Sequence, residues 1–597
     1  MMEWSLKELY ESFESKEFLN DIDKIKEYAE FLESYTEKTL INDENTATYI
    51  LDFVKYNEEV NTLITKTQAF ASLTSATDAN NSDAIFYVNK IQELATLFVK
   101  PWVKFQMFIK SCDNLEEIID SNDELKVFEF FLNETKAKSE YLLSEKEEIL
   151  ISKMNMTGAK AWENLQNKVS STLMIDVELD QEMKSLPLPA VRNLAYHKDA
   201  VVRKQAYEAE MKAYEVIETA SSAALNGIKG EVLTLSQWRG YESPLDETLI
   251  KSRMDREILD AMLVAIKKAL PSFHKYYQHK AILLKHKNGL PFYDLFAPIT
   301  ETSTTYTYAE AMDFVIKQFR TFSDELADFT QHAYDNNWLD VTPRAGKRGG
   351  AFCSNIHPIK QSRVLSNFDG SFSNLTTLAH ELGHAYHGHQ LKDESILNSR
   401  YPMPIAETAS IFCESIVVHA AIKEASTSEK IAILEASISD AGQVIVDILS
   451  RFIFESSLFE KRSEGVVSIE QLKELMTLAQ KEAYGSGLDH DQLHPYMWLN
   501  KPHYYSAALN FYNFPYAFGL LFAKGLYAQY LLEGESFVSK YNQLLQATGK
   551  ANIKDVALMA DVDVTNSEFF EQSLSLIESE INQFIELTSQ DFESSKS

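Results

Sequence analysis

The chain contains the sequence His380-Glu381-Leu382-Gly383-His384, within residues 371–386, which read SFSNLTTLAHELGHAY. Side chains four residues apart lie on one face of an α-helix, so both imidazoles can bind one tetrahedral Zn²⁺ while Glu381 faces a bound water. The pattern therefore predicts a zinc site that carries its own general base, and it makes hydrolysis the leading hypothesis.

The residues around this pattern are typical of a half-buried helix. The segment begins with Ser and Asn residues that suit a helix N-cap, and its apolar residues recur at helical spacing at positions 375, 378, 379 and 382. A chain of this composition would contain the five-residue pattern by chance about three times in a hundred. The helical context disfavours the alternative, a surface turn with two histidines, because a metal site has to be partly buried.

A tetrahedral site needs a third protein ligand, and Glu407 is the better candidate. It follows Met403-Pro404 and lies at the start of a second apolar-periodic segment, residues 406–414, which read AETASIFCE. On a helix Glu407 and Glu414 share one face, so Glu407 can close the site while Glu414 orients a ligand histidine. The alternative for Glu414 is a solvated helix position.

Two other sources of a third ligand are disfavoured. One class of zinc peptidases has Gly three residues and His six residues after the second motif histidine, but those positions hold His387 and Gln390. Glu394 belongs to the run Lys392-Asp393-Glu394, which is typical of a solvated loop. It is therefore a weaker candidate than Glu407.

Two short segments before the helix are predicted to be β-strands, residues 351–353 and 363–368. An exposed edge strand can pair with an extended peptide through main-chain hydrogen bonds, without demanding a particular side chain. Gly349 and Gly350 would let a substrate backbone come close, and Gly350 and Ala351 are therefore candidate substrate-binding residues. Taken alone, the GKRGG sequence that ends at Gly350 is more typical of a flexible turn.

Residues 494–530 are unusually rich in aromatic and histidine side chains. Most of them are expected to form core or cleft wall, because aromatic side chains at helical spacing usually do. Hydrolysis of a peptide also needs donors aimed at the developing oxyanion, and phenol or imidazole groups can supply them.

Several sequence blocks follow one another along the chain: GKRGGAFC at 346–353, SRVLSNFD at 362–369, HELGH, AETAS at 406–410, KPHYY at 501–505 and FYNFPYAFG at 511–519. With these blocks the chain resembles the oligoendopeptidase F branch of the thimet-oligopeptidase-like zinc metallopeptidases. The resemblance is strongest over residues 346–519.

The resemblance implies a mainly α-helical fold, a multi-helix, two-lobed zincin with a small β-sheet beside the HExxH helix and a central substrate channel. It implies His380, His384 and Glu407 as ligands of one Zn²⁺ per chain, with Glu381 as the general base. The expected substrates are short, unfolded oligopeptides that enter the channel, whereas folded proteins are kept out.

The resemblance also implies that a histidine and one or more tyrosines from the aromatic block donate hydrogen bonds to the oxyanion. The matching positions are His503 and Tyr512, with Tyr505 and Tyr516 as further candidates. The sequence around Pro515 departs from the pattern of the wider group, so the resemblance leaves open which tyrosine has this role.

Long helical periods dominate the rest of the chain, for example over residues 85–110 and 255–285. The clearest break is Leu186-Pro187-Leu188-Pro189, because each proline disfavours helix at the residue before it. We therefore expect an N-terminal helical lobe over residues 1–190 and a zinc metallopeptidase catalytic domain over residues 191–597.

Composition excludes some classes of protein. A chain of 597 residues with 45% apolar residues can bury a large core. Its net charge of −31 argues against nucleic-acid and anionic-membrane partners. Three cysteines favour a reducing compartment over a disulfide framework, and we expect Cys353 and Cys413 to be buried packing residues. The sequence contains neither a secretory signal nor an apolar run of about 18 residues, so we expect a soluble, cytoplasmic protein. No feature indicates an oligomeric state.

The favoured function is a zinc-dependent oligoendopeptidase that cleaves internal peptide bonds. A zinc carboxypeptidase or dipeptidyl carboxypeptidase of related helical fold is the alternative enzyme. The non-enzyme alternative is a helical binding scaffold with an accidental HELGH. The presence of Glu381, three candidate ligands and aromatic donors disfavours the scaffold.

Overall fold

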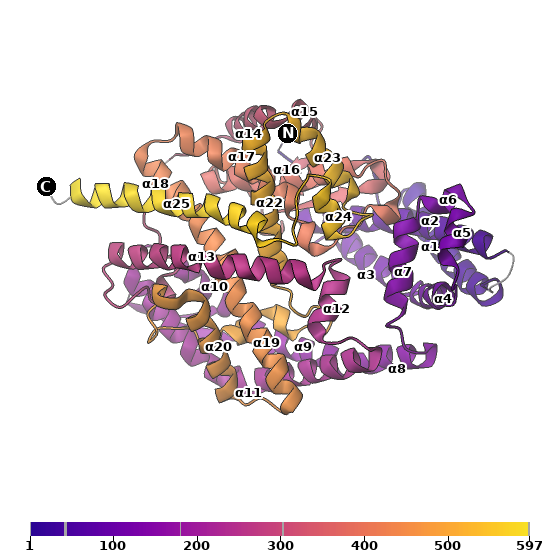
Figure 1. Ribbon diagram of the computed structural model, residues 1–597, viewed down its shortest axis with the longest axis horizontal. Coiled ribbons are helices and arrows are strands. Elements are labelled where there is room, and N and C mark those ends of the chain that lie inside the picture. Colours follow the sequence, from indigo (N-terminus) through magenta and orange to yellow (C-terminus); the bar gives the residue numbers. More distant parts are fainter. Residues whose placement is uncertain (1, 41–44, 180, 301–303, 595–597) are drawn as a thin grey trace. The chain divides into compact units, whose positions relative to one another are not determined.

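α-Helices make up most of the structure, a computed structural model that describes residues 2–40, 45–179, 181–300 and 304–594 (Figure 1). Two small β-sheets accompany the helices, one of two strands and one of three. The predicted fold class, a mainly α-helical protein with a small sheet beside the HExxH helix, is confirmed.

The chain divides into two compact units, each assembled from three segments. Unit 1 comprises Met1–Glu145, Thr304–Ala420 and Gln529–Val562, and unit 2 comprises Lys146–Ser303, Ala421–Ala528 and Asp563–Ser597. Each unit therefore combines parts of the chain that lie far apart in sequence. The predicted boundary near residue 190, the two-lobed arrangement and the substrate channel stay predictions.

Unit 1 contains the HExxH helix. Its helices are α1 (Lys16–Lys38), α2 (Thr46–Thr77), α3 (Ser82–Thr96), α4 (Val99–Lys110), α5 (Leu115–Asp120), α6 (Asp123–Lys126), α7 (Glu129–Ser139), α14 (Tyr308–Phe322), α15 (Asp324–Asp335), α16 (Phe372–Gln390), α23 (Ser536–Ala547) and α24 (Ile553–Leu558). Helix α17 (Thr408–Glu424) begins in this unit and ends in unit 2.

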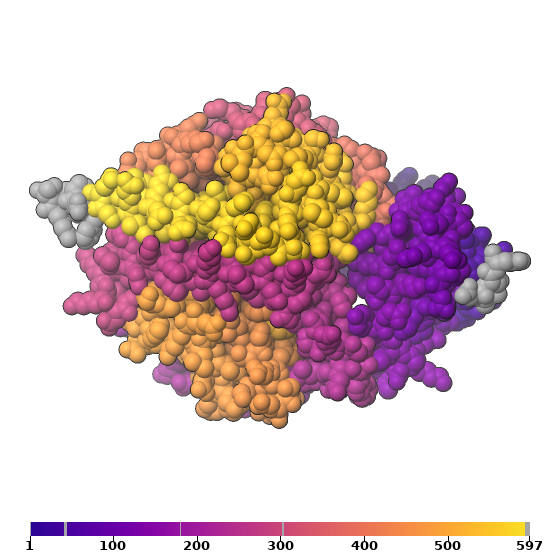
Figure 2. Space-filling view, in the orientation of Figure 1, coloured from indigo at the N-terminus to yellow at the C-terminus, as the bar shows by residue number. Residues whose placement is uncertain are grey.

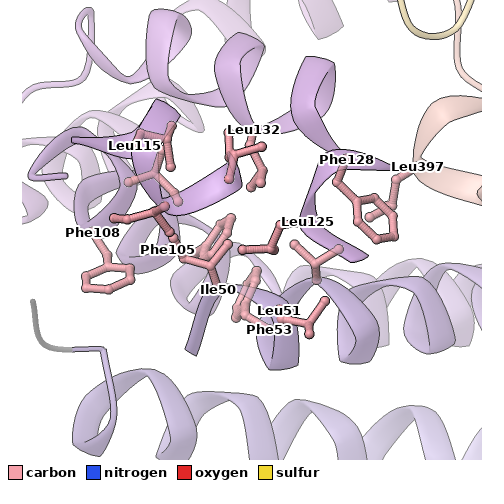
Figure 3. Packing of buried hydrophobic residues seen from close by; sticks show 14 of the residues in the cluster. Ile50, Leu51, Phe53, Phe105, Phe108, Leu115, Leu125, Phe128, Leu132 and Leu397 are labelled. Carbon is pink, nitrogen blue, oxygen red and sulfur yellow. The ribbon is translucent and has the colours of Figure 1, made fainter. Parts of the chain in front are cut away.

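The N-terminal helices of unit 1 share a core with the segment that follows the HExxH helix. The hydroxyl of Ser15 caps α1 by accepting the backbone N–H of Phe18. Stacked rings join α2 to α4, since the centroids of Phe53 and Phe105 are 3.9 Å apart. Leu397 reaches the same cluster from the loop after α16 (Figure 3). This core therefore ties the chain near the site to the N-terminal helices.

The sheet of unit 1 lies beside α16. Its strands, in spatial order, are β3 (Leu339–Asp340), β5 (Gln361–Leu365) and β4 (Phe352–Ile356). β4 and β5 are antiparallel, with Cys353 opposite Val364, and α16 packs against both strands. Both predicted strands are present, and β4 is an edge strand.

The GKRGG loop before β4 is tied to its surroundings by buried hydrogen bonds. The side chain of Lys347 is fully buried, and its Nζ atom lies 2.8 Å from Oδ1 of Asp340. The same ammonium group donates to the backbone carbonyl of Ser366 at 2.6 Å. The carbonyl of Gly346 accepts the backbone N–H of Ala79, just after α2. These contacts disfavour the flexible turn that the sequence of the loop suggests when taken alone.

Unit 2 is built around α11 (Ala200–Arg239), a helix of 40 residues. The side chain of Asp199 caps its start, and Gly240 ends it with φ +85°, the left-handed conformation that favours glycine. The other α-helices and strands are α8 (Glu145–Asn155), α9 (Ala159–Ser171), β1 (Met174–Leu179), β2 (Glu182–Pro187), α10 (Leu188–Asn193), α12 (Pro244–Lys251), α13 (Arg256–Leu283), α18 (Thr427–Gly442), α19 (Ile448–Glu464), α20 (Ile469–Tyr484), α21 (Met497–Asn500) and α25 (Ser567–Ser594). Helix α22 (Phe514–Glu533) begins in this unit and ends in unit 1.

The C-terminal helix completes unit 2. Helix α25 packs along α13, and Figure 2 shows its yellow residues lying beside the magenta residues of α13.

At the sequence break that we predicted, Pro187 ends β2 and serves as the N-cap of α10. The prolines therefore separate a β-hairpin from the helices that follow.

Among the described residues, Met403–Glu424 is the segment with the length and apolar character of a membrane span. Its mean hydropathy reaches 1.5 over 18 residues, and half of that window is buried inside the structure. Core helices of soluble proteins have the same composition, so this resemblance to a span is weak evidence for one.

Replacing Lys347 by Met tests the anchoring of the GKRGG loop. The change removes the ammonium partner of Asp340 but leaves Arg344 paired with the same carboxylate at 2.7 Å, so we expect the apparent free energy of unfolding to fall by about 1–3 kcal/mol in urea titrations. The matched control is Lys360→Met, which breaks an exposed pair with Asp393 (2.6 Å) and should change stability little. Equal effects of the two substitutions would contradict the anchoring.

Candidate metal centre

Helix α16 directs the two motif histidines toward one point. The hydroxyl of Ser371 accepts the backbone N–H of Asn374 at 3.2 Å, so the helix starts where the sequence predicts. The ring centroids of His380 and His384 are 5.0 Å apart, and both side chains are partly buried.

The third candidate ligand, Glu407, lies just before the first residue of α17. Its Oε2 atom is 3.2 Å from Nε2 of His380 and 3.3 Å from Nε2 of His384. The hydroxyl of Ser410 donates a hydrogen bond to the same oxygen at 2.8 Å. The structure therefore brings together the three residues that the sequence pattern selected, and Ser410 holds the carboxylate in place.

The donor atoms of these three side chains fit a zinc ion. They all lie within 4.8 Å of one another, and no other group of this kind occurs in the described part of the chain. A tetrahedral zinc with bonds of about 2.0–2.1 Å holds its ligand atoms about 3.3 Å apart. Both nitrogen-to-oxygen distances match that spacing. Two imidazoles and one carboxylate also leave a fourth position for water, as hydrolytic zinc sites require.

Gly383 lets the start of α17 approach α16 closely enough to place Glu407. A Cβ atom on Gly383 would lie 2.4 Å from the carbonyl oxygen of Ala409 and 2.6 Å from Cα of Ser410. Both are main-chain atoms, which cannot swing aside as the end of a flexible side chain can. A side chain at position 383 would therefore push the carboxylate away from the two histidines.

The electrostatics of this group favour a cation. Burial works against a charge on His380, but hydrogen bonds with Glu407 and Glu414 outweigh it and raise the pKa of His380 to about 10. Burial also works against a charge on Glu407, yet the two histidines hold the pKa of that carboxyl well below its usual range. Glu407 therefore stays ionised and attracts positive charge to the point where the donor atoms meet.

Glu414 lies beside the first motif histidine. Its Oε2 atom is 3.2 Å from Nδ1 of His380, the ring nitrogen that does not face Glu407. This is the neighbour that the sequence pattern predicted for Glu414, and its orienting function stays a prediction.

The residues that we disfavoured as third ligands have other partners. Gln390 occupies the position of the third histidine in the other class, and its Nε2 atom donates to Oε1 of Glu325 at 2.9 Å. Glu394 forms an ion pair with Lys550 at 2.5 Å. Neither side chain belongs to the candidate metal group.

Glu381 lies between the two histidines in sequence and is 7% exposed. Burial raises the pKa of its carboxyl group, while His380 and His384 partly offset that shift. A hydrogen bond from the backbone N–H of Cys353 on β4 also lowers the pKa. A raised pKa makes a carboxylate a stronger base, which suits it to accept a proton from water.

The free edge of β4 lies next to Glu381. On β5, Val364 donates its backbone N–H to Trp338, on the side away from β4. Backbone groups alternate in direction along a strand, so Cys353, which lies opposite Val364, belongs to a non-hydrogen-bonded pair. The N–H and C=O groups of Cys353 and Asn355 therefore point toward the free edge.

Gly350 and Ala351 immediately precede β4. Gly350 has φ +77°, and open space surrounds the position that its Cβ would occupy. Its carbonyl accepts a hydrogen bond from Nδ2 of Asn367 at 3.0 Å. The two residues lie at the start of the edge strand, and their contact with a substrate stays a prediction.

The cysteines near the site are free thiols that burial makes unreactive. Cys413 is buried, as we expected, whereas Cys353 is only partly buried. Burial raises the pKa of both thiols well above the ordinary value. Neither side chain therefore has the character of a nucleophile.

Asn355 is a residue of the site that no pattern in the sequence indicated. Its side-chain amide donates to the backbone carbonyl of His384 at 3.1 Å, and its Oδ1 atom accepts the hydroxyl of Ser362 at 2.7 Å. Gly388 leaves room for this side chain, because a Cβ there would lie 2.4 Å from it. Asn355 thus fastens β4 to α16 beside the second motif histidine. Its one signal in the sequence is its position two residues beyond the predicted strand of residues 351–353.

In unit 2, three of the predicted oxyanion donors form one group. The ring of Tyr512 lies 5.2 Å from that of His503 and 5.6 Å from that of Tyr516, between centroids, and all three residues are partly exposed. Tyr505 differs, because it is 1% exposed and burial raises the pKa of its phenol far above the ordinary value. A phenol enclosed in this way is poorly suited to contact a substrate.

The environment of His503 keeps it neutral. Burial lowers the pKa of its imidazole, and the positive charges of Arg451 and Lys501 lower it further. A neutral imidazole carries one N–H group, so His503 can donate a hydrogen bond near pH 7.

Comparison with known proteins establishes the family. The family model described as "Peptidase family M3" matches residues 193–576, and a model described as "Oligopeptidase F" matches residues 111–174. The chain belongs to peptidase family M3. This finding confirms the resemblance that the sequence blocks indicated.

Curated relatives match over nearly the whole chain. Oligopeptidase PepF of Bacillus subtilis is 24% identical over 98% of this chain and 87% of its own length. The chromosomal oligoendopeptidase F of Lactococcus lactis is 24% identical over 98% of this chain and 97% of its own length. The protein is a metalloendopeptidase, and its substrates are peptides.

Solved structures share the fold. The crystal structure of oligoendopeptidase-F from Enterococcus faecium has a TM-score of 0.71 at 19% identity, over 96% of this chain and 99% of its own. A solved structure from Chlamydophila abortus reaches a TM-score of 0.84 at 21% identity, over 98% of each chain.

Changing Gly383 to Ala tests the close approach of α16 and α17. The added Cβ collides with the carbonyl of Ala409, so we expect the affinity for zinc to fall by about 10–100-fold, measured by competition with a fluorescent chelator. Gly465→Ala is the control, because open space surrounds Gly465. Wild-type zinc affinity in Gly383→Ala would contradict this account.

Proposed function

We propose that the protein is a zinc-dependent oligoendopeptidase that hydrolyses internal bonds of short, unfolded peptides. The observation that carries the proposal is the close grouping of the donor atoms of His380, His384 and Glu407. The buried carboxyl of Glu381 lies on α16, the helix of the two histidines, and the free edge of β4 lies beside Glu381. Family membership supports peptide hydrolysis, and this arrangement supports the finer assignment.

His380, His384 and Glu407 hold one Zn²⁺ per chain. When bound, the ion lowers the pKa of a water molecule toward neutrality and polarises the carbonyl of the scissile bond. Glu414 accepts a hydrogen bond from Nδ1 of His380, which directs the lone pair on Nε2 toward the metal. The 3.2 Å distance between Glu414 and His380 supports this orienting function.

Glu381 moves the proton in the reaction. Its carboxylate takes a proton from the attacking water and later gives it to the nitrogen of the leaving amine. The raised pKa of Glu381 supports the assignment, because the carboxyl group must hold that proton between the two steps. Its helix also places it one residue from the first ligand and three from the second.

The edge of β4 binds the substrate as an added strand. The C=O group of Cys353 and the N–H and C=O groups of Asn355 pair with the backbone of the peptide, and Gly350 and Ala351 leave space at the start of the strand. Such pairing requires an extended peptide and makes little use of its side chains. It therefore favours short, unfolded substrates over folded proteins.

His503 and Tyr512 donate hydrogen bonds to the oxyanion that forms when water adds to the carbonyl. Their partial exposure and the neutral state of His503 support this function. Tyr516 belongs to the same group and is the alternative phenol. We leave out Tyr505, because its phenol is enclosed in the core. Loss of one such donor typically lowers kcat by about 10²–10³-fold.

We propose that the protein is located in the cytoplasm. The three cysteines are free, and a reducing compartment keeps them so. The net charge of −31 disfavours nucleic acid and anionic membrane surfaces as partners.

The test uses a quenched peptide blocked at both ends and the variant Glu381→Gln. We expect a chelator to abolish cleavage by the wild type and added zinc to restore it. Glu381→Gln should keep one zinc per chain and lower kcat/KM by about 10²–10⁴-fold, because only the proton acceptor is lost. Zinc content is measured by atomic emission on the same sample.

Glu394→Gln is the matched control, since Glu394 pairs with Lys550 outside the metal group, and it should retain wild-type turnover. Normal turnover by zinc-loaded Glu381→Gln would refute the assigned base. Cleavage only of a peptide with a free C-terminus would instead support the carboxypeptidase alternative.

A further inference from the structure

A fully buried ion pair contacts both ends of the turn that contains Tyr512, residues 510–513. Lys229 of α11 and Glu455 of α19 are 0% and 2% exposed, and Nζ of Lys229 is 2.9 Å from Oε1 of Glu455. The ammonium group also lies 4.8 Å from the ring centroid of Phe459. Charged side chains are rarely buried so completely unless every charged atom has a partner.

The remaining hydrogen bonds of this pair go to two asparagines, one on each side of Tyr512. Lys229 donates to Oδ1 of Asn510 at 2.9 Å, and Nδ2 of Asn513 donates to Oε2 of Glu455 at 3.0 Å. Each charged side chain therefore holds one end of the turn, and the pair joins the two ends.

The turn between the asparagines has an unusual backbone. Phe511 has φ +51°, a left-handed conformation that is uncommon for a residue with a side chain. Its ring is buried and stacks on Phe459 at 5.5 Å, and its carbonyl accepts the backbone N–H of Asn513 at 2.7 Å. This conformation buries Phe511 while leaving Tyr512 partly exposed. It persists only where the surroundings hold it firmly.

Further contacts tie both asparagines to regular elements. The carbonyl of Asn510 accepts the hydroxyl of Thr248 on α12 at 2.9 Å. Oδ1 of Asn513 accepts the backbone N–H of Phe514, the first residue of α22, at 2.6 Å. The turn is therefore connected to α11, α12, α19 and α22 of the same unit.

We propose that the Lys229–Glu455 pair positions Tyr512 for the reaction. This inference rests on the proposed function, in which the phenol of Tyr512 donates to the oxyanion. A buried ion pair gives little net stability over apolar side chains of similar size, but its directional hydrogen bonds hold the two ends of the turn at fixed points. Lys229 and Glu455 are positioning residues, since they act through the asparagines and not on the substrate.

The test is a double-mutant cycle between Lys229→Met and Tyr512→Phe. In the wild-type background Lys229→Met should lower kcat by about 10²-fold, because a displacement of about 1 Å is enough for such a loss. KM and zinc content should stay unchanged. In the Tyr512→Phe background Lys229→Met should change kcat by less than about twofold, because residues that act through one another are not additive.

The matched control is Lys280→Met. Lys280 is equally buried and pairs with Glu435 at 2.6 Å in the same unit, but its ammonium group donates to the Leu295 carbonyl and not to the Tyr512 turn. Both lysine variants are compared by thermal unfolding, and activity is measured well below the lower midpoint. Lys280→Met should keep kcat within about twofold of the wild type.

The outcomes separate this inference from the proposed function. No loss of kcat in Tyr512→Phe would refute the assigned donor, and the positioning inference with it. If Tyr512→Phe is impaired but Lys229→Met lowers kcat equally in both backgrounds, only the positioning inference fails. Should Lys229→Met not fold, Asn513→Ala, which leaves the ion pair intact, must show the same non-additivity with Tyr512→Phe, and additive losses would refute the inference.

Discussion

The close contact between α16 and the start of α17 is the constraint on which the site depends. An α-helix can align His380 and His384 by itself, but the third donor has to come from another segment. Glu407 reaches both histidines because Gly383 allows the main chain at Ala409 to touch the helix. Because position 383 has no Cβ atom, a third donor can join the two histidines of the helix.

The segments that we propose to contact the substrate are each held by buried charge. In unit 1, Lys347 ties the loop before the edge strand to Asp340 and to a main-chain carbonyl. In unit 2, the pair of Lys229 and Glu455 ties both ends of the Tyr512 turn. Catalytic groups must keep their positions within a fraction of an ångström, and directional hydrogen bonds in a dry interior provide that precision better than apolar packing alone.

Local patterns predicted the parts of the site that depend on helix geometry. The cap at Ser371 and the shared face of the two histidines both follow from residue spacing along one helix. Both strands overlap the predicted segments, although β4 extends to Ile356, beyond the predicted residue 353, and β5 ends at Leu365, before the predicted residue 368. These features need only short-range information.

Features that depend on tertiary packing could not be predicted. Nothing near Tyr505 in the sequence distinguishes it from Tyr512, yet the fold buries the first and leaves the second partly exposed. The partners of Lys347 likewise come together only through the sheet. Breaks in the sequence also do not reveal that each unit is assembled from three separate segments.

X-ray absorption at the zinc edge, on the purified full-length protein, tests the central claim most directly. The account predicts one zinc per chain, with two imidazole nitrogens and one carboxylate oxygen at about 2.0–2.2 Å and a further oxygen from water. A sulfur ligand, a shell with fewer than two imidazoles, or protein that takes up no zinc would contradict it.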